Sequence, residues 1–166
     1  MSERNFRKML EAKWVEGKFV CVGLDSEYVK IPEVARLETI HLTILGFNIR
    51  IVDATKDLVC AYKLNMAFYE AYGDVGWLAL RETIIHIHKV APDVPVILDA
   101  KRADIGNTNR GYVQEAFDFL QADAITVHPY LGKEALEPFL NCKDKGIIVL
   151  CRTSNKGAGE FQDLTV

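Results

Sequence analysis

The stretch VPVILDAKRADIGNT, residues 94–108, joins an apolar run to a dense group of charges. Residues 96–98 are typical of a buried β-strand, because they are apolar and partly β-branched. The run ends in Asp99, Lys101 and Asp104 instead of the glycine, asparagine or proline that ends most strands. Opposed charges at the end of a buried strand cost free energy unless they are paired or used, so the stretch indicates a candidate functional site.

The same kind of apolar run occurs at five places along the chain. The five predicted strands are residues 19–25, 58–65, 94–101, 123–129 and 146–154. Each is nearly continuous and contains β-branched residues, as expected for strands covered on both faces. Helical spacing of apolar residues predicts helices over 33–54, 76–91, 107–121 and 132–142, after an amphipathic leading helix over 4–16. The alternation of strand and helix predicts an α/β fold with a parallel sheet.

Polar side chains stand at the carboxyl end of every predicted strand. In chain order they are Asp25, Lys63, the pair Asp99 and Lys101, His128, and Arg152 to Ser154. In a (β/α) barrel the carboxyl ends of all strands meet at one face, which carries the chemistry. In a doubly wound sheet the same ends would spread along an edge. The convergence of polar residues favours the barrel.

Four of these charges are expected to form one alternating row. Asp99 and Lys101 are two residues apart, so on a strand they point to the same side. Lys63 ends the neighbouring strand and approaches Asp99 laterally, while Asp104 lies just beyond Lys101. Each charge then has an opposite neighbour, which favours ionisation of all four. The alternative interpretation is an ion-pair network that only caps the end of the sheet.

The bulk composition excludes several classes of function. The 166 residues are 49% hydrophobic, enough for a core, and carry a net charge of −3, which gives no sign of nucleic-acid binding. No apolar stretch approaches the roughly 18 residues that span a membrane. The charged start MSERNFRKMLEAKW lacks the apolar centre of a signal peptide, which predicts a cytoplasmic protein.

Cysteines and histidines give no metal signature. The four cysteines, Cys21, Cys60, Cys142 and Cys151, form no C-x-x-C pair and are interpreted as reduced core thiols. The sequence HIH at 86–88 would place two imidazoles on one face of a strand, but it lies in a predicted helix, where these positions diverge. No metal site is predicted.

Several segments resemble one known family. LDAKRADIGNTNRGY (98–112) resembles the signature of orotidine 5′-phosphate decarboxylase. FVCVGLD (19–25) and CAYKLNMAFYEAYGDVG (60–76) resemble the first two strands of that family, and ITVHPYLG (125–132) and LCRTSNKGAGEFQDL (150–164) resemble the fourth and fifth strands of its bacterial-type branch. The likeness is collinear from residue 19 to residue 164.

The resemblance implies a reaction and its central residues. The family converts orotidine 5′-phosphate to UMP and carbon dioxide, the last step of de novo pyrimidine biosynthesis, without a metal or an organic cofactor. The difficulty is a carbanion at C6, which must be stabilised by placed charge and a ready proton. By motif, Lys101 would protonate C6 and Asp99 would lie beside the substrate carboxylate.

Further residues acquire roles through the same resemblance. Lys63 would pair with Asp99 and touch a ribose hydroxyl, and Asp25 would bind the ribose. Ser154 matches the serine that reads the pyrimidine edge. Asp104 and Thr108 match positions that reach into the partner's site, which implies a homodimer with shared sites.

The sequence departs from the family pattern in one respect. The family fold is an eight-stranded TIM (β/α)8 barrel, whereas five strands are predicted here. The segments that follow strands 7 and 8, which in this family grip the 5′-phosphate with a glutamine and an arginine, are not in the sequence. Residues 1–166 are therefore expected to be one barrel domain without strands 6–8, and we expect the printed sequence to be part of a longer protein.

Two other functions stay open. One is a Mg²⁺-dependent barrel enzyme such as 3-keto-gulonate 6-phosphate decarboxylase or hexulose phosphate synthase, which shares the D-x-K-x-x-D pattern. The D-I-G-N-T continuation and the Ser154 segment argue against it. The other is a non-catalytic nucleotide-binding fragment, suggested by the missing phosphate-binding segments.

Overall fold

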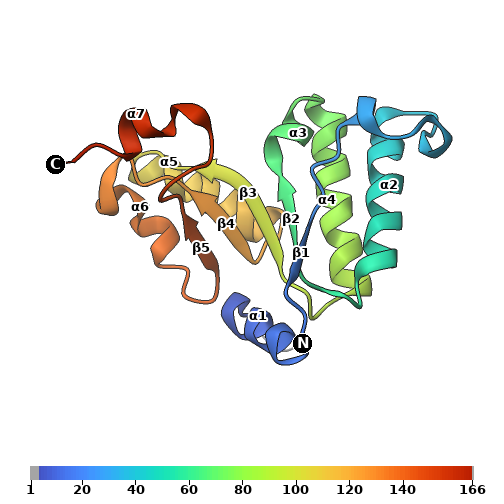
Figure 1. Ribbon diagram of the computed structural model, residues 1–166, viewed down its shortest axis with the longest axis horizontal. Helices are drawn as coiled ribbons and strands as arrows, with labels where there is room; N and C mark the ends of the chain where they lie inside the picture. The colour runs from blue at the N-terminus through green and yellow to red at the C-terminus, as the bar shows by residue number, and fades with distance from the viewer. Residues whose placement is uncertain (1–3, 166) are drawn as a thin grey trace.

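The computed structural model describes residues 4–165, and residues 1–3 and 166 of the predicted domain lie outside them. The sheet has five strands in the order β1-β2-β3-β4-β5, with every neighbouring pair parallel. The strands are β1 (Val20–Gly23), β2 (Val59–Asn65), β3 (Val96–Arg102), β4 (Ala124–Val127) and β5 (Gly146–Val149). Because spatial order follows chain order, right-handed crossovers place the helices on one side of the sheet, as in an arc of a barrel (Figure 1). The predicted α/β class is confirmed.

The helices follow the predicted order with shorter bounds. They are α1 (Phe6–Val15), α2 (Ile40–Thr55), α3 (Met66–Glu70), α4 (Gly73–Val90), α5 (Gly106–Val113), α6 (Gly132–Leu140) and α7 (Gly159–Gln162). A π-helical segment, Gln114–Phe119, extends α5, and short 3₁₀ turns lie at Tyr28–Lys30, Glu33–Ala35 and Lys156–Ala158. The helix predicted over 33–54 begins only at Ile40, because the Thr39 hydroxyl accepts a hydrogen bond from the Leu42 N–H at 3.1 Å and caps it.

The core lies between the sheet and the helices. Tyr62 and Leu64 of β2 and Leu98 of β3 are fully buried on this side. Ile84 and Phe139 are among the helical residues of the same cluster. Because side chains alternate across a strand, Lys63 and Asp99 project to the opposite face, away from the helices. Burial of one face thus fixes the direction of the charged residues.

The two edge strands differ from the prediction. β1 and β5 leave much of their surface exposed, so the expectation that all five strands are covered on both faces is wrong for these two. Each has a neighbouring strand on one side only among the described residues. The prediction of core thiols is wrong for Cys21 and Cys151, which are exposed on or just beyond these edge strands; all four cysteines are free.

Helix α1 lies across the amino-terminal ends of the strands (Figure 1). The N–H of Phe6 donates to the carbonyl of Asp144, just before β5, at 2.9 Å. Gly146 opens β5 against the Phe6 ring, and a Cβ at this position would collide with that ring. Among residues 4–165, no helix is long and apolar enough to cross a membrane.

Candidate active site

A row of alternating charges lies at the carboxyl ends of β1, β2 and β3. The Lys63 ammonium contacts both carboxylate oxygens of Asp25 at 3.2 Å and Oδ2 of Asp99 at 3.4 Å. The Lys101 ammonium donates to Oδ1 of Asp99 at 2.7 Å. Asp25, Lys63, Asp99 and Lys101 therefore form one continuous chain of ion pairs. The structure brings Lys63, Asp99 and Lys101 together as the strand alternation predicts.

The backbone of Lys101 is strained. Its φ is +48°, in the left-handed region that residues with a Cβ rarely adopt. The register between β3 and β4 shifts between Leu98 and Arg102, so Lys101 lies in an irregular segment of the ladder. Its N–H donates to the Thr126 hydroxyl at 2.9 Å instead. Such strain persists only where surrounding contacts enforce it, and it is concentrated at functional sites.

Asp99 is the most enclosed member of the row, with a side chain 12% exposed. Burial raises the pKa of its carboxyl, but hydrogen bonds from Lys101 and Thr126 and the positive charges of Lys101 and Lys63 lower it by more. The net pKa lies below its usual value, so Asp99 is ionised at neutral pH. A fixed negative charge therefore stands beside an ammonium group that is half exposed.

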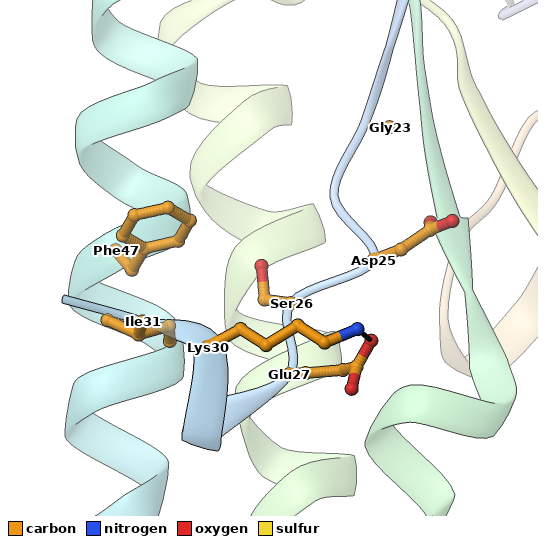
Figure 2. A pocket seen from close by; sticks show the side chains of 7 residues that line it. All are labelled: Gly23, Asp25, Ser26, Glu27, Lys30, Ile31 and Phe47. Carbon is orange, nitrogen blue, oxygen red and sulfur yellow. Dashed lines mark hydrogen bonds and ion pairs between the residues drawn. The ribbon is translucent and has the colours of Figure 1, made fainter.

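A hollow of about 260 Å³ adjoins the Asp25 end of the row (Figure 2). It is lined by Gly23, Asp25, Ser26, Glu27, Lys30, Ile31 and Phe47. Asp25 turns away from Phe47 toward the strands, and Lys30 pairs with Glu27 at 2.5 Å in front of it. The N–H of Asn65 also donates to Oδ1 of Asp25, at 3.2 Å. The carboxylate that follows β1 is thus held against the carboxyl end of β2.

Three predicted site residues lie outside the row. Asp104 accepts a hydrogen bond from the N–H of Ile105 at 2.6 Å and forms no ion pair with any of residues 4–165. The fourth member of the row is therefore Asp25, which pairs with Lys63, and the predicted place of Asp104 beyond Lys101 is wrong. Thr108 is exposed in the first turn of α5. Ser154 is exposed between β5 and α7. Within this chain, none of the three contacts the charge row.

Thr126 belongs to the site but was not predicted from the sequence. The Thr126 hydroxyl donates to Oδ1 of Asp99 at 2.8 Å while it accepts from the Lys101 N–H. The signal was available, because strand alternation places Thr126 on the same side as His128, which ends that strand. Arg102 turns the other way and donates to Glu70 at 2.6 Å, which ties the end of β3 to α3.

The two histidines of HIH diverge, as predicted for a helix. His86 contacts Asp53 at 2.9 Å, whereas His88 lies 4.0 Å from Asp123. Within residues 4–165, no three His, Cys, Asp or Glu side chains gather into a cluster that could hold a metal ion.

A parallel β/α arc with polar groups converging at the carboxyl ends of its strands is the architecture of barrel enzymes. Comparison with known proteins identifies the family. The model of the orotidine 5′-phosphate decarboxylase / HUMPS family matches residues 18–166, and the chain belongs to this family. The resemblance found in the sequence is confirmed.

Individual relatives agree with this assignment. An orotidine 5′-phosphate decarboxylase of Herpetosiphon aurantiacus is 51% identical over 145 residues, which are 87% of this chain and 52% of the relative. A crystal structure of a putative orotidine-monophosphate-decarboxylase from Toxoplasma gondii superposes with a TM-score of 0.88 at 40% identity, over 97% of this chain and 54% of that one. The structure of Leishmania donovani OMP decarboxylase gives 0.84 at 39% identity, over 98% and 59%.

The chain spans about half the length of the curated relatives it matches, between 52% and 59% for eight of them. The described fold is accordingly the first five β/α units of the barrel seen in the solved structures that match it. This confirms the predicted fold class.

Proposed function

We propose that the protein decarboxylates orotidine 5′-phosphate to UMP and carbon dioxide, as a step of pyrimidine biosynthesis, without a metal or an organic cofactor. The observation that supports this most is the continuous row Asp25–Lys63–Asp99–Lys101 at the carboxyl end of the sheet. Membership of the family and the names of the relatives support the same reaction.

Lys101 is the proton donor in this proposal. The bond between C6 and the carboxylate breaks, carbon dioxide leaves, and the electron pair stays on C6. The Lys101 ammonium stabilises this charge and then transfers a proton to C6, which leaves UMP. Its 2.7 Å contact with Asp99 holds the ammonium in place beside a negative charge.

Asp99 acts on the substrate through its charge. It is ionised and enclosed, so a substrate carboxylate placed beside it is repelled, and that repulsion disappears when carbon dioxide leaves. Lys63 screens Asp99 from Asp25 and contacts a ribose hydroxyl. Asp25, beside its hollow, binds the ribose, and Ser154 reads the pyrimidine edge.

The test is turnover in the presence of a chelator. Full-length protein in EDTA should lower the ultraviolet absorbance of orotidine 5′-phosphate, and Lys101→Ala should slow this loss by about 10²–10⁴-fold. The matched control is Lys8→Ala, an exposed lysine on α1 at the opposite end of the sheet, which should retain full turnover. Activity that appears only with added Mg²⁺ would instead indicate the magnesium-dependent sugar-phosphate enzymes.

We also propose a homodimer in which Asp104 and Thr108 reach the partner's site. Asp104 lies just before α5 and forms no ion pair with residues 4–165, Thr108 is exposed in the first turn of α5, and Ile105 between them is 60% exposed. Mixing inactive Lys101→Ala with inactive Asp104→Ala should then restore turnover, because a mixed dimer contains one intact site. Failure of the mixture, with both variants dimeric by sedimentation, would contradict shared sites.

We place the enzyme in the cytoplasm. The four free cysteines, two of them exposed, support a reducing compartment.

A further inference from the structure

A buried polar network connects three helices to the carboxyl end of β1. The Ser26 hydroxyl donates to Oδ1 of Asn48 at 2.6 Å. The Asn48 amide donates to the Tyr69 hydroxyl and to Thr83 Oγ1, both at 3.0 Å. The Tyr69 hydroxyl in turn donates to the carbonyl of Leu24 at 2.5 Å. The network thus joins α2, α3 and α4 to residues 24 and 26.

This network is fully enclosed and fully satisfied. Asn48, Tyr69 and Thr83 have no exposed surface, and Ser26 is 7% exposed. Both N–H groups and the oxygen of the Asn48 amide have partners, so its orientation is fixed. Burial raises the pKa of Tyr69, so its hydroxyl stays protonated and able to donate. Satisfied buried networks specify a single arrangement of the groups they join.

Both anchored residues are neighbours of Asp25. Tyr69 holds the carbonyl of Leu24, and Asn48 holds the side chain of Ser26, so the backbone is fixed on either side of residue 25. Figure 2 shows Ser26 and Asp25 extending in different directions, with Asp25 toward the strands. There its carboxylate meets Lys63 and the N–H of Asn65.

We propose that Tyr69 and Asn48 are positioning residues that set the Asp25 carboxylate against Lys63 and, through it, the end of the charge row. The inference extends the proposed function, because it names which buried residues keep the ribose-binding carboxylate in place. Neither residue touches the row itself; both act through the backbone of residues 24–26.

The fold offers a matched control for the test. Tyr62, on β2, is also fully buried, and its hydroxyl bonds to the carbonyl of Val52 and to Thr55, away from residues 24–26. Tyr69→Phe and Tyr62→Phe therefore remove the same hydroxyl from two tyrosines that have no exposed surface. A purely structural role would give both variants the same properties after correction for stability.

The first readout requires no substrate. The Asn65 N–H donates to Asp25, so its hydrogen exchange reports whether the carboxylate is in place. Tyr69→Phe should speed exchange at Asn65 by about tenfold, the equivalent of one lost hydrogen bond. Tyr62→Phe should leave it unchanged. Equal exchange in the two variants would overturn the proposal, and Ser26→Ala replaces Tyr69→Phe if that variant does not fold.

The second readout is turnover of orotidine 5′-phosphate by the full-length protein. Tyr69→Phe should raise KM by about tenfold with little change in kcat. In an Asp25→Ala background the same change should have almost no further effect, because the group it positions is gone. An additive loss in that background would overturn the proposal. Absence of turnover in the wild type would contradict the proposed function alone, and Asn65 exchange would still decide the positioning role.

Discussion

The two ends of the sheet both pair acids with bases, but they do so differently. At the amino-terminal end, Asp123 is 1% exposed and accepts two hydrogen bonds from Arg4 at 2.8 and 2.7 Å and one from the N–H of Val96 at 2.9 Å. At the carboxyl end, Lys63 is shared between Asp25 and Asp99 at 3.2 to 3.4 Å. Asp123 is held by close contacts from Arg4 and Val96. The row at the carboxyl end combines one close pair, Lys101 with Asp99 at 2.7 Å, with the longer contacts of Lys63.

The accessibility of the bases differs as well. Arg4 bonds Asp123 and also the carbonyls of Pro92 and Val94, so its donors are used in attaching α1 to the sheet. The Lys101 side chain is 49% exposed and is carried by a strained backbone. A saturated pair stabilises the fold, and an accessible, strained one can act on a substrate. Ion pairs by themselves therefore do not locate the active site.

Cavity size does not locate it either. A cavity of about 910 Å³ lies at the amino-terminal end between α1, α4 and the π-helical segment, larger than the 260 Å³ hollow beside Asp25. Its lining includes Arg4, Lys13 and Asp93, whose charges are already paired: Lys13 bonds Asp93 and Arg4 bonds Asp123. We assign the chemistry to the carboxyl end of the sheet because the accessible and strained Lys101 lies there.

The largest expected effect is on turnover. Lys101→Ala should lower kcat by about 10²–10⁴-fold, the usual contribution of a proton donor. Its stability should change little, because the Lys101 side chain is half exposed. The rate of orotidine 5′-phosphate turnover gives kcat, and urea unfolding of the same sample gives the stability. A large loss of stability with normal turnover would reverse the roles assigned to the two ends.

The next effect is on stability at the opposite end. Asp123→Asn should lower the free energy of unfolding by about 3 kcal/mol, since it leaves Arg4 without its charged partner at a buried position. Turnover per folded molecule should be unchanged. Urea titration gives the first quantity and an assay at low temperature the second. If kcat fell as it does in Lys101→Ala, the amino-terminal end would belong to the active site.

A smaller effect is expected at Thr126, which supports the site without being charged. Thr126→Val keeps the shape but removes the donor to Asp99 and the acceptor for the Lys101 N–H, at a cost of about 1–3 kcal/mol in transition-state stabilisation. Thr126→Ser keeps the hydroxyl and should restore kcat. Comparison of kcat in the two variants makes the test, and equal activity would mean that the strained Lys101 needs no such support.

The smallest effect is on acid stability. The pKa of Asp99 is lower in the folded protein than its value of about 3.9 in an unfolded chain, so the ionised carboxylate stabilises the fold above about pH 4. This contribution is lost as the pH falls through the lower folded pKa. Wild-type stability should therefore fall more steeply in acid than that of Asp99→Asn, by urea titration at a series of pH values. Parallel curves would mean that Asp99 is not held ionised by its partners.

The sequence was sufficient for the order of elements and for the direction of the central charges. Continuous apolar runs predicted β2 and β4 well, because these strands are buried in the middle of the sheet. The i, i+2 spacing of Asp99 and Lys101 placed both at the site, since alternation is a local property of a strand. The family motif added the roles that alternation cannot supply.

Other features depend on distant contacts and could not be predicted. The fifth predicted strand ends at Val149 instead of Ser154, and the left-handed Lys101 arises from a register shift against β4. The link between Asp25 and Lys63 depends on how β1 and β2 pair, which no local pattern contains. Short helices such as α3 have too few residues to show a helical period.

The most direct test of the account is the turnover of orotidine 5′-phosphate per folded molecule, measured side by side for Lys101→Ala and Asp123→Asn. We predict that the first variant is folded and almost inactive, and that the second is less stable but turns over at the wild-type rate once folded. An active Lys101→Ala, or an inactive but folded Asp123→Asn, would contradict the assignment of the chemistry to the carboxyl end of the sheet.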